Sequence, residues 1–151
     1  MEINSAAPVI TRDEILIDAP IETIWGIQTD VNAWPSWQPD VDRAQADGPL
    51  AVASVFRWQT AGLDIISTVQ EINPPRRIVW GGSAQGIVAV HVWVFDQQPG
   101  GVLVRTEESW EGEPVNAQAE VLQPALDRSL RNWLENLKRA AEDSVGPTTR
   151  H

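Results

Sequence analysis

A chain of 151 residues with 42% hydrophobic and 21% charged residues is expected to form one globular domain with a substantial core. Its formal net charge of −10 argues against nucleic acid and against an anionic membrane surface as partners, because both require clustered Lys and Arg. The absence of cysteine excludes disulfides and thiolate chemistry. With no signal-peptide pattern and no apolar run long enough to cross a membrane, we expect a cytoplasmic protein.

The first predicted elements are a strand at residues 9–17 and a helix at residues 21–29, which Pro20 introduces. Residues 34–39 contain two prolines, so they form a short turn or 3₁₀ segment rather than a long helix. Further strands are bounded by turn residues and are expected at residues 41–46, 54–60, 63–72, 77–80, 87–95 and 102–111. Their short connections predict antiparallel hairpins.

The last predicted element is a helix at residues 126–141, with Pro124 in its first turn or at a kink. Its apolar residues recur at helical spacing, at Leu126, Leu130, Trp133, Leu134, Leu137 and Ala141. The order of elements predicts an α+β helix-grip domain at residues 9–143, in which a curved seven-stranded antiparallel sheet surrounds the C-terminal helix. Residues 1–8 and 144–151 are expected to be flexible tails.

The chain is unusually rich in tryptophan, with eight Trp, two Phe and no Tyr. A tryptophan offers a large flat ring and an N–H group, so it suits the wall of a ligand site, although these rings could equally be structural. A single helix is not expected to fill the concave face of a curved sheet, so we expect a tryptophan-lined cavity between the two. The tryptophans are Trp25, Trp34, Trp37, Trp58, Trp80, Trp93, Trp110 and Trp133.

Strand alternation selects the candidate ligand contacts. Phe56 and Trp58 share one face of their strand, and alternation in the strand at residues 102–111 predicts an apolar inner face that also carries Glu108. In the segment at residues 34–39, one tryptophan ring could plug the open end of the sheet and the other could form the lip of a pocket. The predicted ligand-binding residues are Trp34, Trp37, Phe56, Trp58, Trp80, Trp93, Val104, Thr106, Trp110, Leu130 and Trp133.

His91 and Glu108 are the candidate catalytic pair. If Phe95 pairs with Val102 across a loop at residues 96–101, His91 lies opposite Thr106 and diagonal to Glu108. A His–Glu pair in a pocket is suited to general acid–base chemistry. The alternative is a hydrogen-bonded histidine that only packs. One such histidine, with no neighbouring His or Cys, predicts no metal site, and no phosphate-binding or dinucleotide-binding motif points to a cofactor.

Several segments resemble the START-like (SRPBCC) superfamily, in the branch of polyketide cyclases/dehydrases and lipid-transport proteins. They are Ile17-Asp18-Ala19-Pro20 followed by Ile24-Trp25, then Asp30, Trp34-Pro35, Trp37 and Pro39, and later residues 71–77, Gly100-Gly101 and Trp133 with Leu137-Lys138. The resemblance covers residues 9–142. It implies a helix-grip fold with a deep pocket for hydrophobic or polycyclic molecules, in proteins that range from carriers to aromatase/cyclases, hydrolases and regulatory modules.

Two departures from that pattern bear on activity. Aromatase/cyclases of this group tend to carry a tyrosine shortly after the Trp-Pro turn, where this chain has Val41, and a pocket arginine near the position of Gln70 or Glu71. The first hypothesis is therefore binding or transport of a hydrophobic, aromatic or polycyclic small molecule. The alternatives are a cyclase/dehydratase that uses His91 and Glu108, and a regulatory protein-interaction module.

Overall fold

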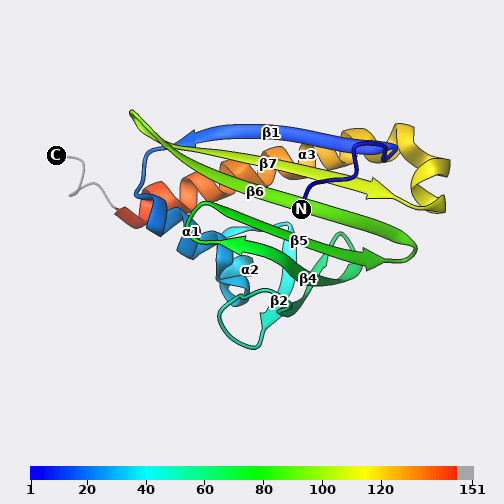
Figure 1. Ribbon diagram of the computed structural model, residues 1–151, viewed down its shortest axis with the longest axis horizontal. Coiled ribbons are helices and arrows are strands. Elements are labelled where there is room, and N and C mark those ends of the chain that lie inside the picture. Colours follow the sequence, from blue (N-terminus) through cyan, green and yellow to red (C-terminus); the bar gives the residue numbers. More distant parts are fainter. Residues whose placement is uncertain (146–151) are drawn as a thin grey trace.

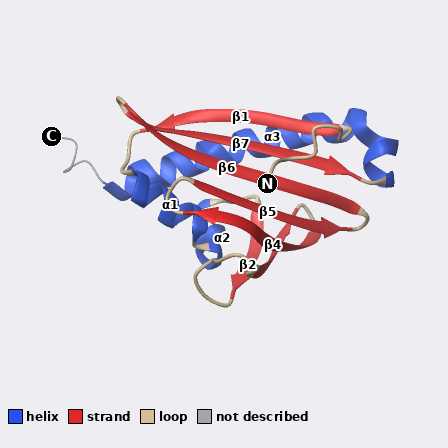
Figure 2. Cartoon of the chain, viewed as in Figure 1, coloured by secondary structure: helices blue, strands red, loops and turns tan. Residues whose placement is uncertain are grey.

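The computed structural model describes residues 1–145, which form one curved antiparallel sheet with helices on its concave side (Figures 1 and 2). The strand order is β1-β7-β6-β5-β4-β3-β2. The strands are β1 (Val9–Ile17), β2 (Val41–Ala46), β3 (Val55–Thr60), β4 (Leu63–Asn73), β5 (Arg77–Ala84), β6 (Ile87–Gln98) and β7 (Gly101–Glu111). The helices are α1 (Ile21–Thr29), the 3₁₀ helix η1 (Val31–Ala33), α2 (Trp34–Trp37) and α3 (Glu113–Val145).

This arrangement confirms the predicted α+β helix-grip fold, including the two short helical segments after the first strand. The clearest difference in strand length is β5, which was predicted to end before Gly81 and instead runs to Ala84. The sequence reason is Gly82. A Cβ there would lie 2.3 Å from the carbonyl oxygen of Ile66, so the glycine allows β4 and β5 to approach closely rather than marking a turn.

The hairpin between β6 and β7 was predicted with the wrong register. Phe95 pairs with Val104 rather than Val102, because β6 continues to Gln98 and the turn contains only Pro99 and Gly100. The shift is two residues, so every side chain keeps its predicted face. Its consequence is that His91 lies directly opposite Glu108 rather than diagonal to it.

The C-terminal helix is longer than predicted and is interrupted at a different residue. α3 begins at Glu113, and its backbone is non-helical at Gln118 (φ −130°, ψ 24°), whereas Pro124 lies inside the helix. The apolar stripe faces the protein as expected, with Leu126, Leu130, Trp133, Leu134, Leu137 and Ala141 buried. α3 packs chiefly against β1, so its helical stripe crosses the concave side of the sheet near one edge.

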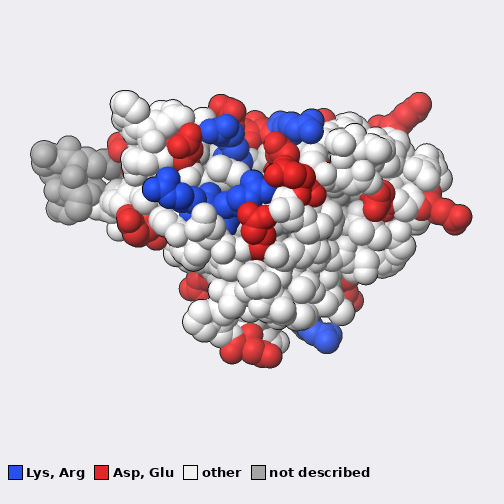
Figure 3. All heavy atoms as spheres, in the orientation of Figure 1, with Lys and Arg blue, Asp and Glu red and all other residues white. Residues whose placement is uncertain are grey.

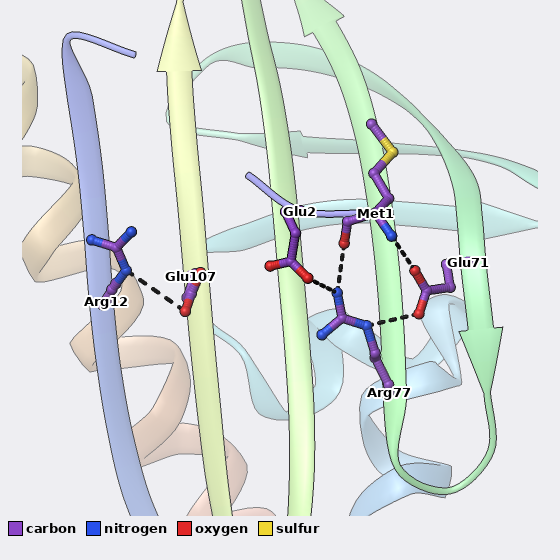
Figure 4. Close-up of polar contacts among 6 residues, drawn as sticks. All are labelled: Met1, Glu2, Arg12, Glu71, Arg77 and Glu107. Carbon is purple, nitrogen blue, oxygen red and sulfur yellow. Dashed lines mark hydrogen bonds and ion pairs between the residues drawn. The ribbon is translucent and has the colours of Figure 1, made fainter. Parts of the chain in front are cut away.

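The first four residues, within the segment 1–8 predicted to be a tail, lie against the outer face of the sheet. The Met1 amino group contacts Glu71, and Arg77 donates from Nε to the other Glu71 oxygen at 2.7 Å (Figure 4). Ile3 is buried in a small apolar cluster with Val79 and Val92. At the other end, α3 extends to residue 145, and the remainder of the predicted tail at 144–151 lies outside the described residues.

The outer face also carries acidic and basic side chains, interspersed over β1, β7 and β6 (Figure 3). Arg12 Nε lies 3.6 Å from Glu107 (Figure 4), and Arg105 donates to Asp96 at 2.9 Å. These pairs are solvent-exposed, so each contributes little to stability. The candidate catalytic and ligand-binding residues lie instead on the concave face.

Candidate functional site

The concave face collects the aromatic side chains that strand alternation predicted to point inward. Trp80, His91 and Glu108 lie in register across β5, β6 and β7, and Trp93 is paired with Thr106 one step along. Phe56 of β3 is 1% exposed, and Trp93 is completely buried. The α1–α2 region and α3 cover this surface, because Trp34 and Trp133 pack into the same apolar cluster as the strand residues.

Trp34 is the centre of the aromatic cluster and is fully buried. Its ring centroid lies 5.0 Å from that of Trp133 and at similar distances from three further rings, mostly edge to face. Edge-to-face contacts match the positive ring edge of one aromatic to the negative face of the next. The concave face is therefore filled by contacting rings, which differs from the tryptophan-lined cavity predicted between the sheet and the C-terminal helix. The ring partners of Trp34 are Phe56, Trp58, Trp80 and Trp133.

Gln28 of α1 accepts hydrogen bonds from two of these tryptophans. Trp34 donates from Nε1 to the Gln28 backbone oxygen at 2.9 Å, and Trp133 donates from Nε1 to Gln28 Oε1 at 2.9 Å. The glutamine is fully buried on the face of α1 that points at α3. Sequence analysis did not single it out as a site residue, although a lone polar side chain on an apolar helix face was the available signal.

Four N–H groups in the described interior are buried without a hydrogen-bond acceptor. They are Trp37 Nε1, Trp93 Nε1, Gln28 Nε2 and Gln38 Nε2. Three of these side chains contact Trp133. The ring centroids of Trp37 and Trp93 each lie 6.0 Å from the Trp133 ring centroid, and Gln28 accepts a hydrogen bond from the Trp133 indole N–H. An unmade buried hydrogen bond costs about 1–3 kcal/mol, so this region of the core favours any group that brings acceptor oxygens.

The eleven predicted ligand-binding residues do not all meet at one place. Eight belong to or pack on the main apolar cluster: Trp34, Trp37, Phe56, Trp58, Trp80, Trp93, Val104 and Trp133. Leu130 and Trp110 belong to a second cluster with Leu126 of α3. Thr106 is 1% exposed and takes part in hydrogen bonds rather than apolar packing.

His91 and Glu108 form a direct contact between β6 and β7. His91 Nδ1 lies 3.2 Å from Glu108 Oε1, and Trp110 donates from Nε1 to Glu108 Oε2 at 2.6 Å. Desolvation raises the pKa of Glu108 to about 7 and lowers the pKa of His91 to about 3. Burial thus disfavours the charged form of each group. Between about pH 3 and about pH 7 both groups are therefore neutral, and the contact is not an ion pair.

A cavity of about 400 Å³ lies at the other side of α1, between this helix, the β2–β3 loop and the β4–β5 turn. None of the eleven predicted residues lines it. Trp25, Leu50 and Ile72 contribute apolar walls and also pack against the main cluster. Sequence reasoning missed this cavity because its walls come from three separate segments; the only local signals were the turn residues Pro49 and Pro74.

Two further features of the described residues bear on function. Across residues 1–145, no three His, Cys, Asp or Glu side chains lie close enough together to hold a metal ion. In the same part of the chain, no helix is both long and apolar enough to span a membrane.

Comparison with known proteins supports the fold over nearly its whole length. The chain is similar to the hypothetical protein jhp0584 from Helicobacter pylori, with a TM-score of 0.83 and 20% identity over 92% of this chain and 91% of that one. It is also similar to the di-domain ARO/CYC StfQ from the steffimycin biosynthetic pathway, with a TM-score of 0.78 and 16% identity over 91% of this chain and 52% of that one.

A further similar structure is the protein TTHA0849 from Thermus thermophilus, with a TM-score of 0.77 and 14% identity over 89% of this chain and 98% of that one. At these identities the structural likeness shows the fold alone. No curated protein matches the chain by sequence. A family model described as polyketide cyclase / dehydrase and lipid transport matches residues 8–142, and the chain therefore belongs to this family.

Proposed function

We propose that this protein binds a flat, largely apolar aromatic molecule non-covalently between the sheet and α3. Membership of a family of polyketide cyclases and lipid-transport proteins supports a hydrophobic ligand. The proposed contacts are the eight predicted residues that belong to or pack on the main apolar cluster: Trp34, Trp37, Phe56, Trp58, Trp80, Trp93, Val104 and Trp133.

The observation that carries this proposal is the set of unpartnered N–H groups around Trp133. Trp93 and Gln28 are fully buried, yet each has a donor without an acceptor. A ligand that inserts among these rings would stack on aromatic faces and could offer carbonyl or hydroxyl oxygens to the donors. The chemistry of the site thus favours an oxygenated polycyclic molecule over a plain hydrocarbon.

The cavity beside α1 offers the route by which such a ligand could reach the rings. Leu50 lies in the β2–β3 loop and packs on the main cluster while also lining the cavity. A ligand in the cavity would begin in contact with Trp25 and continue inward by separating the rings that close the concave face.

A matched pair of probes tests the proposal. Anthraquinone and anthracene have the same three fused rings, but only anthraquinone carries acceptor oxygens. We expect both to quench the tryptophan fluorescence saturably, with anthraquinone binding about tenfold more tightly, as one or two additional hydrogen bonds would give. The variant Trp93→Phe keeps an aromatic ring and removes one N–H, so the preference for anthraquinone should shrink while anthracene still binds.

The control variant is Trp25→Phe, at the cavity and away from the unpartnered donors. It should leave the preference between the two probes unchanged. The absence of a saturable response to either probe, extended to a wider panel of flat ligands, would contradict the proposed function.

The second candidate is an acid–base enzyme of the cyclase/dehydratase kind, and the His91–Glu108 contact favours it. A neutral carboxylic acid with a pKa of about 7 beside an imidazole can donate a proton to a leaving hydroxyl. With a β-hydroxy ketone as probe, we expect elimination of water, followed by the absorbance of the enone. Glu108→Gln and His91→Ala should each lower turnover by about 100-fold or more while binding persists; a pure carrier would show no turnover to lose.

A further inference from the structure

The cavity of about 400 Å³ beside α1 is a separate space from the aromatic cluster around Trp34, because none of the rings that contact Trp34 lines it. Its volume lies within the range of about 300–1,000 Å³ that small-molecule sites occupy. Three of its apolar side chains come from different elements: Trp25 from α1, Leu50 from the β2–β3 loop and Ile72 from β4. A small apolar group in the cavity would therefore be enclosed by three separate segments.

Two sets of contacts fix the walls of this cavity. Asn32 donates from Nδ2 to the Ala46 carbonyl oxygen at 3.1 Å, and the Ala46 backbone N–H donates to Asn32 Oδ1 at 2.9 Å. Both residues line the cavity, so this reciprocal pair joins η1 to the end of β2 at the wall itself. Trp25 packs edge to face on Phe95 of β6, with the ring centroids 5.5 Å apart. Because these walls are already ordered, a ligand would bind with little cost of ordering them.

Asp30 is the one ionisable residue among the described residues that line the cavity. It lies between α1 and η1 and is exposed, and its side chain makes no capping hydrogen bond to η1. Within residues 1–145, no Lys, Arg or His forms an ion pair with its carboxylate. The cavity therefore carries one negative charge that no group of the described chain neutralises.

The C-terminal end of α1 adds to this negative charge. Thr29, the last residue of α1, lines the cavity together with Gly26 of the same helical turn. The last carbonyl groups of a helix carry a partial negative charge, which a nearby cation stabilises. The last turn of α1 contains no basic side chain that could supply that cation. A positively charged ligand group beside Asp30 would complement both the carboxylate and the helix end.

We propose that the cavity beside α1 is a second ligand site, which takes a small aromatic molecule carrying a positively charged amine. The ring of the ligand packs against Trp25, Leu50 and Ile72, and its ammonium group lies beside Asp30 at the end of α1. The formal net charge of −10 adds a long-range attraction for cations. This site does not depend on the proposed function, since none of the unpartnered interior N–H groups lines it.

Two probes with the same phenylethyl body test the requirement for charge. 2-Phenylethylamine is a cation at neutral pH, whereas 2-phenylethanol is neutral. We expect both to shift the indole N–H signal of Trp25 saturably in NMR titrations, with the amine binding about tenfold more tightly at low salt. This preference should shrink in about 0.5 M NaCl, because salt screens exposed charges. Equal affinities for the two probes, or a response of the Trp93 and Trp37 indoles in place of Trp25, would overturn the proposal.

Asp30→Asn separates the effect of the carboxylate from the shape of the cavity. The amide is nearly the same size, so the variant should bind 2-phenylethanol as the wild type does and lose most of its preference for the amine. The matched control is Asp42→Asn, because Asp42 is an exposed carboxylate of β2 that does not line the cavity. The control should keep the tenfold preference. A preference that survives Asp30→Asn, or that falls equally in both variants, would contradict a site built on Asp30.

Discussion

Replacing Trp34 with alanine is expected to lower the free energy of unfolding by about 3–5 kcal/mol. Trp34 is fully buried, contacts four other rings and donates its indole hydrogen to the Gln28 backbone oxygen. The alanine would leave a cavity at the centre of the cluster and an unpaired carbonyl oxygen. Neighbouring rings are too rigid to collapse into that space, so most of the loss should persist.

Urea denaturation followed by far-ultraviolet circular dichroism measures this loss, because the mutation itself alters tryptophan fluorescence. Trp37→Ala is the matched control: Trp37 is only partly buried, has one ring partner, and leaves its own N–H unpaired. We expect this control to cost about 1–2 kcal/mol. A Trp34 variant that loses less than its control would show that the rings are loosely packed.

The second large effect concerns pH and the buried pair. In the unfolded chain, Glu108 and His91 titrate near their ordinary values of 4.5 and 6.5, whereas in the folded protein their pKa values are about 7 and about 3. Between pH 4.5 and 6.5 the unfolded pair holds one proton, on His91, and the folded pair also holds one, on Glu108. The two contributions to the pH dependence of stability therefore cancel in this window.

Removing either partner should expose the contribution of the other. In Glu108→Gln, the depressed pKa of His91 makes stability rise by about 2–3 kcal/mol from pH 4.5 to 6.5. In His91→Asn, the raised pKa of Glu108 makes stability fall by about 3 kcal/mol from pH 4.5 to 7. The sign differs because folding expels a proton from His91 and retains one on Glu108.

Urea midpoints measured at several pH values test this pair of variants, each compared with the wild type. The other carboxylates of the chain titrate alike in all three proteins, so they cancel in the comparison. Parallel stability–pH curves for the three proteins would contradict the account of Glu108 and His91 as a buried, neutral pair.

The fold was predictable because local signals agreed with one another. Period-two alternation assigned Phe56 and Glu108 to the inner face, and helical spacing assigned Trp133 to the buried side of α3. The register between β6 and β7 could not be predicted, because Pro99 and Gly100 fit both a two-residue turn and the middle of a longer loop. Likewise, Pro124 was expected in the first turn of the helix or at a kink, whereas the helix begins at Glu113 and is interrupted at Gln118.

The packing inside the site was less predictable than the identity of the residues that point into it. Sequence alternation tells which way a ring points, but it carries no information on whether opposing rings are separated or in contact. Trp34 approaches from a short helix and Trp133 from the C-terminal helix, so their 5.0 Å centroid distance depends on packing between distant segments. The unpartnered donors, such as Trp93 Nε1, emerge only from that packing.

The indole N–H signals of Trp93 and Trp37 give the most direct test of ligand binding between the sheet and α3. Addition of anthraquinone should move these two NMR signals downfield and slow their exchange with solvent, because each gains an acceptor. The Trp34 signal should move least, since its hydrogen is already donated to Gln28. A response confined to Trp25 at the outer cavity, or no response at any indole, would contradict an internal ligand site.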